Sequence, residues 1–186
     1  MGPAGDAMKA ETIATVEMPG LQRIACLHAD VVGYCRLIAH DVTSTVRTLT
    51  AHRAMMIEAI TRQGGTVIDT AGDSLLATFS GAGDAVACAV EIQQELARRN
   101  ARLLPERRIT FRIGIELGDA LVEDGRVYGH CVNVAARVQQ AAQPGSIYVA
   151  GRAYDDIEGA LPWRLEYVGR SSVKSIDEPQ RLYRVN

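Results

Sequence analysis

The chain has 186 residues, of which 47% are hydrophobic and 23% are charged, and its formal net charge is −2. This length and composition suit a single globular domain with a substantial core and argue against disorder. The small net charge gives no reason to expect general binding to nucleic acid or to an acidic lipid surface. A specific anion site stays compatible with it, because a few neighbouring Arg and Lys side chains are enough.

The four cysteines are Cys26, Cys35, Cys88 and Cys131, and they form no CxxC pair and no Cys/His pattern with metal spacing. We expect reduced, mostly buried thiols in a cytoplasmic protein rather than disulfides. No apolar run reaches the ~18 residues of a membrane span, and the start of the chain lacks a signal-peptide core. A soluble chain without membrane contact is therefore expected, and a regulatory domain outside it stays open.

Residues 1–20 have weak periodicity and are interpreted as a flexible arm, and residues 21–186 as one domain. The mostly apolar run 24–30 ends in an acid and predicts a buried strand. Apolar residues then recur at helical spacing over residues 37–60, and the pair Gly64-Gly65 predicts the end of that helix.

Two further strands are predicted over residues 66–70 and 74–79, with a tight turn at residues 71–73. The remaining pattern predicts helix, strand, helix, strand and a tail of short strands over residues 84–100, 109–117, 129–142, 146–150 and 163–185. The first six elements form a β-α-β-β-α-β unit. This order predicts an α+β fold, a ferredoxin-like or palm-type sheet covered by helices.

Two carboxylates stand at the ends of predicted strands. Asp30 closes the first strand, and Asp73 lies at the tip of the predicted hairpin. Two acids at one sheet edge suit Mg²⁺ or Mn²⁺, although an Asp in such a place is also a common turn or cap residue. The backbone N–H groups after Asp30, including those of Gly33 and Tyr34, are candidates for binding phosphate.

A polar pair lies on the helix predicted over residues 129–142. Asn133 and Arg137 are four residues apart, so a helix places them on one face, while small apolar residues occupy the other faces. On this evidence alone, an ordinary solvent-facing surface pair is the favoured interpretation.

Five sequence blocks occur in a fixed order: Ala-Asp-Val-Val-Gly-Tyr (29–34), Thr-Ala-Gly-Asp-Ser (70–74), Phe-Arg-Ile-Gly-Ile-Glu-Leu-Gly (111–118), Tyr-Gly-His-Cys-Val-Asn-Val-Ala-Ala-Arg (128–137) and Pro-Gly-Ser-Ile-Tyr-Val (144–149). This series resembles the catalytic domains of class III adenylyl and guanylyl cyclases, and the resemblance covers residues 23–185. It implies conversion of ATP or GTP to the 3′,5′-cyclic monophosphate and pyrophosphate for signalling. It also implies two Mg²⁺ or Mn²⁺ ions per site and a head-to-tail homodimer with shared sites.

The resemblance also implies roles for individual residues. Asp30 and Asp73 match the family's metal-binding aspartates, and we include Val31 beside them in the metal site. Asn133 matches the asparagine that orients the ribose, and Arg137 the arginine that stabilises the α-phosphate in the transition state.

Two further matches concern the phosphate chain. Arg112 matches an arginine that contacts the pyrophosphate end. Lys174 matches a phosphate-binding lysine, although the glycine that follows it in the family is Ser175 here.

Two positions depart from the adenylyl cyclase pattern. Where those enzymes carry a Lys and an Asp that read adenine, this chain has Asp69 and Arg126. A carboxylate can accept from guanine N1–H and its 2-amino group, and an Arg can donate to O6, so the pair fits guanine in principle. The alternative is that the two side chains pair with each other, within or across a dimer, and read no base.

The altered base positions keep a second function open: a weak or inactive cyclase-like domain that binds nucleotide or mediates dimerisation. A diguanylate cyclase is disfavoured, because the Gly-Gly-Asp/Glu-Glu-Phe hairpin is missing from the sequence. Glu116, where the family has His, would add negative charge near the phosphates if that strand end faces them.

Overall fold

The computed structural model describes residues 20–171 and 179–186, so the predicted arm over residues 1–20 lies outside them except for Gly20. A bilayer-spanning helix, which would need a long apolar stretch, is absent from these two ranges. In chain order the elements are β1 (Gln22–Val31), α1 (Tyr34–His40), α2 (Val42–Arg62), β2 (Thr66–Asp69), β3 (Ser74–Phe79), α3 (Ala82–Asn100), the 3₁₀ turn η1 (Pro105–Arg107), β4 (Phe111–Glu123), β5 (Arg126–Tyr128), α4 (His130–Ala141), β6 (Ile147–Ala150), α5 (Gly151–Ile157), β7 (Leu165–Ser171) and β8 (Gln180–Val185).

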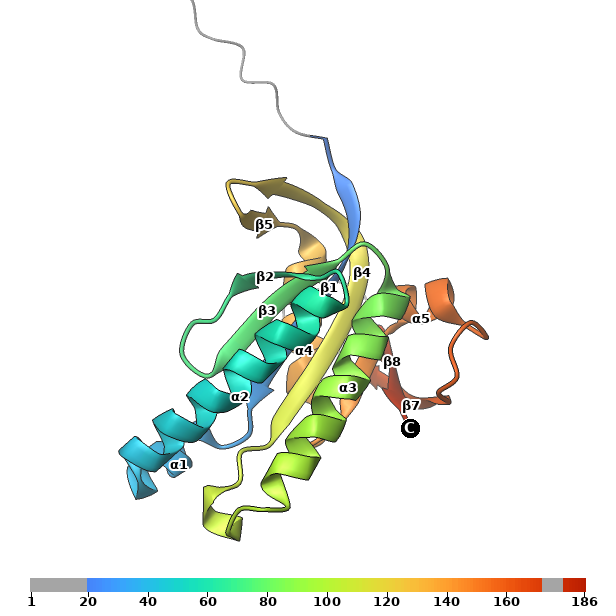
Figure 1. The fold of residues 1–186 in the computed structure, drawn as a ribbon. Coiled ribbons are helices and arrows are strands. Elements are labelled where there is room, and N and C mark those ends of the chain that lie inside the picture. Colours follow the sequence, from blue (N-terminus) through green and yellow to red (C-terminus); the bar gives the residue numbers. More distant parts are fainter. Residues whose placement is uncertain (1–19, 172–178) are drawn as a thin grey trace, which may run out of the picture.

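The strands form one mixed sheet in the order β2-β3-β1-β4-β6-β8-β7, and β5 pairs with the far end of β4. The long strand β1 lies between β3 and β4 and is antiparallel to both, whereas β4 and β6 are parallel. Helices α2 and α3 lie on one face of the sheet and α4 lies on the other (Figure 1). The predicted β-α-β-β-α-β order and the α+β class are confirmed.

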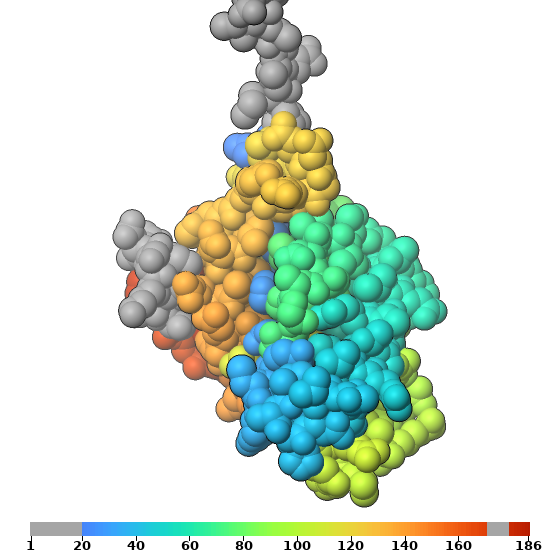
Figure 2. Space-filling view, turned by 90° about the vertical axis from the view of Figure 1, so that its left-hand side faces the viewer, coloured from blue at the N-terminus to red at the C-terminus, as the bar shows by residue number. Residues whose placement is uncertain are grey.

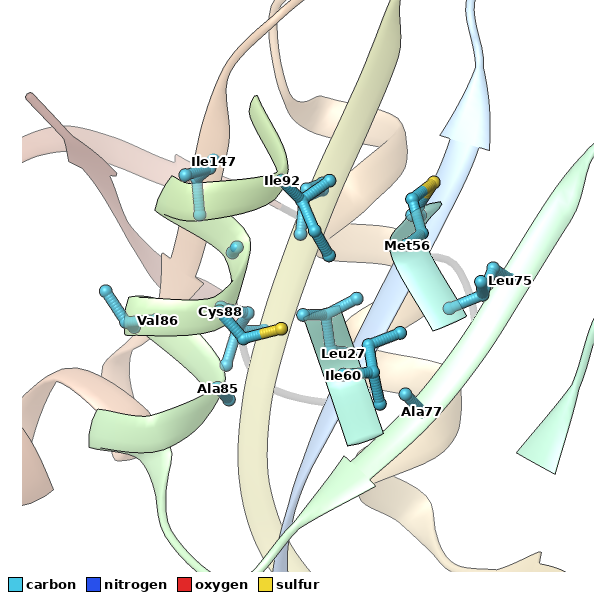
Figure 3. Packing of buried hydrophobic residues seen from close by; sticks show 14 of the residues in the cluster. Leu27, Met56, Ile60, Leu75, Ala77, Ala85, Val86, Cys88, Ile92 and Ile147 are labelled. Carbon is cyan, nitrogen blue, oxygen red and sulfur yellow. The ribbon is translucent and has the colours of Figure 1, made fainter. Parts of the chain in front are cut away.

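Alternate residues of β1 point to opposite faces of the sheet. Ala25, Leu27 and Ala29 are buried on the α2/α3 side, where they share a core with Met56 of α2 and Ile92 of α3 (Figure 3). Burying a large aliphatic side chain of this kind contributes roughly 1.5–3 kcal/mol. This core holds β1 and its neighbours in register, and so fixes where the strand ends lie.

The opposite face of β1 packs against α4. Ile24 and Cys26 lie against Cys131 and Ala135 of α4, and the Sγ atoms of Cys26 and Cys131 are 3.5 Å apart. All four cysteines are free and only Cys35 is exposed, as the sequence predicted.

Gly114 permits the close approach of α4 to the sheet. A Cβ atom at this position would lie 2.2 Å from the backbone nitrogen of Gln139 and 2.4 Å from the carbonyl oxygen of Ala135. Both contacts are with helix backbone, which cannot move aside as a side chain can. The height of α4 above β4 therefore depends on this glycine.

Glu116 is buried between the sheet and α4, with 2% of its surface exposed, and it is the register partner of Cys26. Burial raises the pKa of Glu116 to about 8, although the charge of Arg152 opposes this shift. Its Oε2 atom has no hydrogen-bond partner among the described residues. Arg112, the candidate phosphate-binding residue, lies four residues before Glu116 at the end of β4. The charge of Glu116 is therefore not near the candidate phosphate site.

Some element boundaries differ from the prediction. The single helix predicted over residues 37–60 is broken at Asp41, whose side chain accepts a hydrogen bond of 2.9 Å from Ser44 N and caps α2. The strand predicted to end at Leu117 continues to Glu123 and turns back as β5, and α5 was not predicted. Periodicity misses such features because the apolar pattern runs on through a short break.

Replacing Gly114 with Ala should lower the free energy of unfolding by about 3 kcal/mol, because the new methyl group collides with the α4 backbone. Urea titration followed by circular dichroism measures the change. Gly83→Ala in α3 is a matched control, since its nearest new contact, Leu161 Cδ2, is at 3.8 Å. Equal effects of the two substitutions would contradict this packing.

Replacing Glu116 with Gln should stabilise the fold more at pH 8 than at pH 5, by on the order of 2 kcal/mol. The unfolded chain releases the Glu116 proton near its ordinary pKa of 4.5, whereas the folded chain keeps it up to about pH 8. The wild-type fold therefore loses stability as the pH rises through this interval, and Gln removes that loss. Urea unfolding at the two pH values tests this; a gain that does not change with pH would contradict it.

Candidate functional site

The two candidate metal carboxylates lie side by side at one end of adjacent strands. Asp30 on β1 is the register partner of Ser74 on β3, and Asp73 is the residue before Ser74. Burial raises the pKa of Asp73, and the nearby negative charge of Asp30 raises it further. Arg53 of α2 donates a hydrogen bond to the carbonyl of Gly72 and thereby ties the turn to the helix.

Arg112 balances the charge of Asp30. It is the register partner of Asp30 on β4, and its Nη2 atom lies 3.3 Å from Asp30 Oδ2. Its Nη1 atom donates to the carbonyl of Gln140 at 3.3 Å. Arg112, the predicted phosphate-binding residue, therefore lies next to the candidate metal carboxylates. The side chain of Arg112 is only partly exposed.

Gln139 of α4 is a site residue that the sequence analysis missed. Its side chain is 1% exposed, and hydrogen bonding orients its amide so that the oxygen accepts from Arg112 Nε at 3.2 Å. The amide nitrogen then donates to the carbonyl of Ala136 at 3.3 Å. The available signal was its position four residues after Ala135, on the inward face of the helix, where a polar residue is unusual.

Asn133 and Arg137 both lie on α4, four residues apart as the predicted helix requires, and both are exposed. The Nη1 atom of Arg137 donates to Gln140 Oε1 at 3.1 Å. Seen from the side, atoms of β1 are visible in a recess between α4 and the β2–β3 hairpin (Figure 2). The recess is therefore bordered by the helix that carries the ribose and phosphate candidates.

Only some main-chain atoms of the loop after Asp30 are available to bind a cation or a phosphate. The apolar side chain of Val31 is buried in the core, so this residue could reach a cation only through its backbone. The N–H of Val32 is bonded to Thr110 O at 2.8 Å and is not available to phosphate. Gly33 has φ +68° and precedes α1, and Tyr34 packs on the core, which leaves its backbone for a phosphate contact.

The two candidate base-reading residues lie on strands that are not neighbours in the sheet. Asp69 is exposed at the end of β2, where its Oδ1 atom accepts from Ala71 N at 3.1 Å. Arg126 is exposed on β5, which pairs with β4. No ion pair joins the two side chains within the described parts of the chain. Of the two ways in which Asp69 and Arg126 could pair, only pairing between protomers stays open.

Lys174, the other predicted phosphate-binding residue, lies outside the described residues.

The donor set fits a hard divalent cation. Among the residues that the structure describes, no three His, Cys, Asp or Glu side chains converge on one point. A pair of adjacent carboxylates without a third protein ligand is the arrangement in which Mg²⁺ takes its remaining ligands from phosphates and water. Burial and the neighbouring charge of Asp30 both raise the pKa of Asp73, and a bound cation would offset them.

Comparisons with known proteins identify the family of the chain. The sequence model of the family described as "Adenylate and Guanylate cyclase catalytic domain" matches residues 16–186. "Putative adenylate cyclase 3" of Rhizobium meliloti is 36% identical over 160 residues, which are 86% of this chain and 27% of that protein. A second curated relative, protein Rv1359 of Mycobacterium tuberculosis, is 33% identical over 150 residues, or 80% of this chain and 56% of its own length.

Solved structures give the same result. The adenylate/guanylate cyclase/hydrolase from Silicibacter pomeroyi has a TM-score of 0.79 and 35% identity, and the match covers 90% of this chain and 98% of that one. The adenylyl cyclase CyaB from P. aeruginosa has a TM-score of 0.78 at 20% identity, with 90% and 95% coverage, and so supports the fold. The chain belongs to the adenylate and guanylate cyclase catalytic domain family, that of the class III nucleotidyl cyclases.

Proposed function

We propose that this chain is a nucleotidyl cyclase that converts a purine nucleoside triphosphate to its 3′,5′-cyclic monophosphate and pyrophosphate for signalling. The observation that carries this proposal is the adjacent pair Asp30 and Asp73, with Arg112 bonded to Asp30. Two Mg²⁺ or Mn²⁺ ions per site are part of the proposal, and the free thiols and nucleotide substrate favour a cytoplasmic location.

In the proposed reaction the ribose 3′-oxygen bonds to the α-phosphorus, the bond to the β-phosphate oxygen breaks, and the hydroxyl proton passes to solvent. Asp30 and Asp73 would hold the cations, which supply Lewis acidity when bound. Arg112, at 3.3 Å from Asp30, would pair with the leaving phosphates in this proposal. Its planar, permanently charged guanidinium suits that contact, and Gln139 keeps it oriented.

The proposal assigns Asn133 to the ribose and Arg137 to the charge that builds on the α-phosphate oxygens. Both side chains are exposed on α4, where a second copy of the chain could bring its own carboxylates against them. Because one chain carries both residue sets, a head-to-tail homodimer would contain two equivalent sites.

Mixing two inactive variants tests the shared site. Asp73→Ala and Arg137→Ala should each lower kcat at least a hundredfold, because each removes charge stabilisation from the transition state. An equal mixture should recover about a quarter of wild-type activity, since about half of the random dimers are mixed and each of these has one intact site. Activity is read as cyclic nucleotide formed. Inactive single variants whose mixture recovers nothing would contradict the shared site.

The preferred base is proposed to be guanine. Asp69 is exposed and keeps its Oδ2 atom available, because only Oδ1 accepts the hydrogen bond from Ala71 N. A carboxylate oxygen can accept from guanine N1–H or the 2-amino group, whereas the corresponding N1 of adenine is itself an acceptor.

The wild-type chain should therefore convert Mn-GTP faster than Mn-ATP, with kcat/KM at least tenfold higher for GTP. Asp69→Lys should reverse the preference, because a lysine donates to adenine N1 and repels guanine N1–H. Products are separated by liquid chromatography after incubation with each nucleotide, and Asp69→Asn serves as the control of similar size. A tenfold preference of the wild-type chain for ATP would contradict the guanine proposal.

The same assay separates an enzyme from a domain that only binds nucleotide or mediates dimerisation. Formation of cyclic nucleotide that requires Mg²⁺ or Mn²⁺ and is lost in Asp30→Asn supports the enzyme. Nucleotide binding without any cyclic product would favour the binding domain instead.

A further inference from the structure

Two buried thiols lie between β1 and the first turn of α4. Cys26 on β1 and Cys131, the second residue of α4, are 0% and 3% exposed, and their Sγ atoms are 3.5 Å apart. The two residues are 105 positions apart in the chain, so the packing of α4 on the sheet brings them together. Both thiols are free, and the proposed reaction uses neither of them.

The two thiols differ in acidity. The Cys26 thiol donates a hydrogen bond to the sulfur of Cys131 and lowers the pKa of Cys131 to about 7. Burial opposes this shift, and the backbone N–H groups of Val132 and Cys131 at the start of α4 support it. The same hydrogen bond, together with burial, raises the pKa of Cys26. Because the thiolate is the reactive form of cysteine, Cys131 is the nucleophile of the pair, and Cys26 is its protonated neighbour.

Glu116 is a third ionisable side chain under this part of α4. It is the register partner of Cys26 on β4. Burial raises the pKa of Glu116 to about 8, so its carboxyl group is mostly neutral at pH 7 and does not repel a Cys131 thiolate. The negative charge of Asp119 acts weakly against that thiolate. The surroundings of Cys131 therefore permit its reactive form at neutral pH.

We propose that Cys26 and Cys131 are an oxidation site, at which a hydroperoxide forms a reversible disulfide that ties α4 to β1 and lowers turnover. The effect on turnover rests on the proposed function, because it acts through Asn133 of α4, whereas formation of the disulfide does not. Transient, redox-sensing disulfides are the kind that cytoplasmic proteins use, and the cytoplasm is the location proposed for this chain.

The oxidation has two steps. The Cys131 sulfur attacks one oxygen of H₂O₂, so that an S–O bond forms, the O–O bond breaks, and the Cys131 proton leaves with the other oxygen as water. The Cys26 sulfur then attacks the Cys131 sulfur, so that the S–S bond forms, the S–O bond breaks, and the Cys26 proton leaves with the hydroxyl group as a second water. The two thiols lose two electrons, which the peroxide gains, and a dithiol reductant reverses the change.

The new bond changes the position of α4. Bonded sulfur atoms are about 2 Å apart, so the two sulfurs must approach each other by roughly 1.5 Å. One turn further along, the backbone of α4 at Ala135 already rests on Gly114 of β4 and cannot come closer. Drawing in the first turn therefore tilts the helix and displaces Asn133, which lies between the two contacts. A displacement of about 1 Å in a group that positions the substrate can lower a rate about a hundredfold.

The test oxidises the full chain carrying Cys35→Ala, because the exposed Cys35 would otherwise link two chains. The chain is treated with H₂O₂, the remaining thiols are alkylated in denaturant, and the peptides are mapped by mass spectrometry. We expect a peptide with Cys26 joined to one with Cys131, and separation of the two by dithiothreitol. Cys88 is the internal control: it is buried in the core beside α2, burial raises its pKa to about 11, and it should still be alkylated (Figure 3).

Turnover is measured on the same samples with GTP and ATP. The oxidised Cys35→Ala chain should form cyclic nucleotide at least about fivefold more slowly than the reduced chain, and dithiothreitol should restore the rate. Adding Cys26→Ala should remove both the link and the loss of turnover, because Cys131 then has neither its hydrogen-bond donor nor its partner. If that variant does not fold, the peptide map and the reversal by dithiothreitol in the Cys35→Ala chain decide the question.

The outcomes separate this proposal from the proposed function. Alkylation of both Cys26 and Cys131 after peroxide treatment, or a link no more frequent than one to Cys88, would overturn the oxidation site. A complete link with unchanged turnover would overturn its effect on the reaction and keep the cyclase function. A reversible link in a chain whose reduced form makes no cyclic nucleotide would refute the cyclase function and keep the oxidation site.

Discussion

Repulsion between two carboxylates held side by side is the electrostatic constraint on which this site depends. Asp30 cannot move away from Asp73, because β1 is paired on both sides and its opposite face is buried in the core. The repulsion must therefore be balanced by positive charge. Arg112 supplies it from the next strand at 3.3 Å, and the buried Gln139 holds the guanidinium in place. A cation bound to the two carboxylates would take over the role of Arg112 at Asp30 and leave the guanidinium free to pair with phosphates.

The close packing of α4 extends this constraint to the rest of the domain. Gly114 lets the helix backbone approach β4, which brings Gln139 to Arg112 and turns Asn133 and Arg137 outward. One chain therefore presents two surfaces: the strand ends that carry Asp30 and Asp73, and the exposed polar face of α4. Glu116 and the thiols of Cys26 and Cys131 are buried under α4, away from Asp30 and Asp73. In the reduced chain they therefore affect the stability of the fold more than the reaction.

Much of this could be predicted from the sequence, because strand ends and hairpin tips place residues without reference to the rest of the fold. The order strand, hairpin and strand allowed Asp30 and Asp73 to lie together, and the resemblance to the family turned that possibility into a prediction. The lack of an ion pair between the described residues Asp69 and Arg126 could not be predicted, because it depends on where the sheet places β2 and β5. Gln139 was missed for a related reason: its contact with Arg112 follows from the face that α4 turns to the sheet, which single-sequence patterns do not specify.

The most direct test of the account measures Mn²⁺ binding to the chain without nucleotide, through the paramagnetic resonance signal of free Mn²⁺. The wild-type chain should bind Mn²⁺, and Asp30→Asn and Asp73→Asn should each weaken binding at least tenfold. Arg112→Gln should bind Mn²⁺ at least as tightly as wild type, because the guanidinium no longer competes for Asp30. Undiminished Mn²⁺ binding by both carboxylate variants would contradict the claim that these two residues form the metal site.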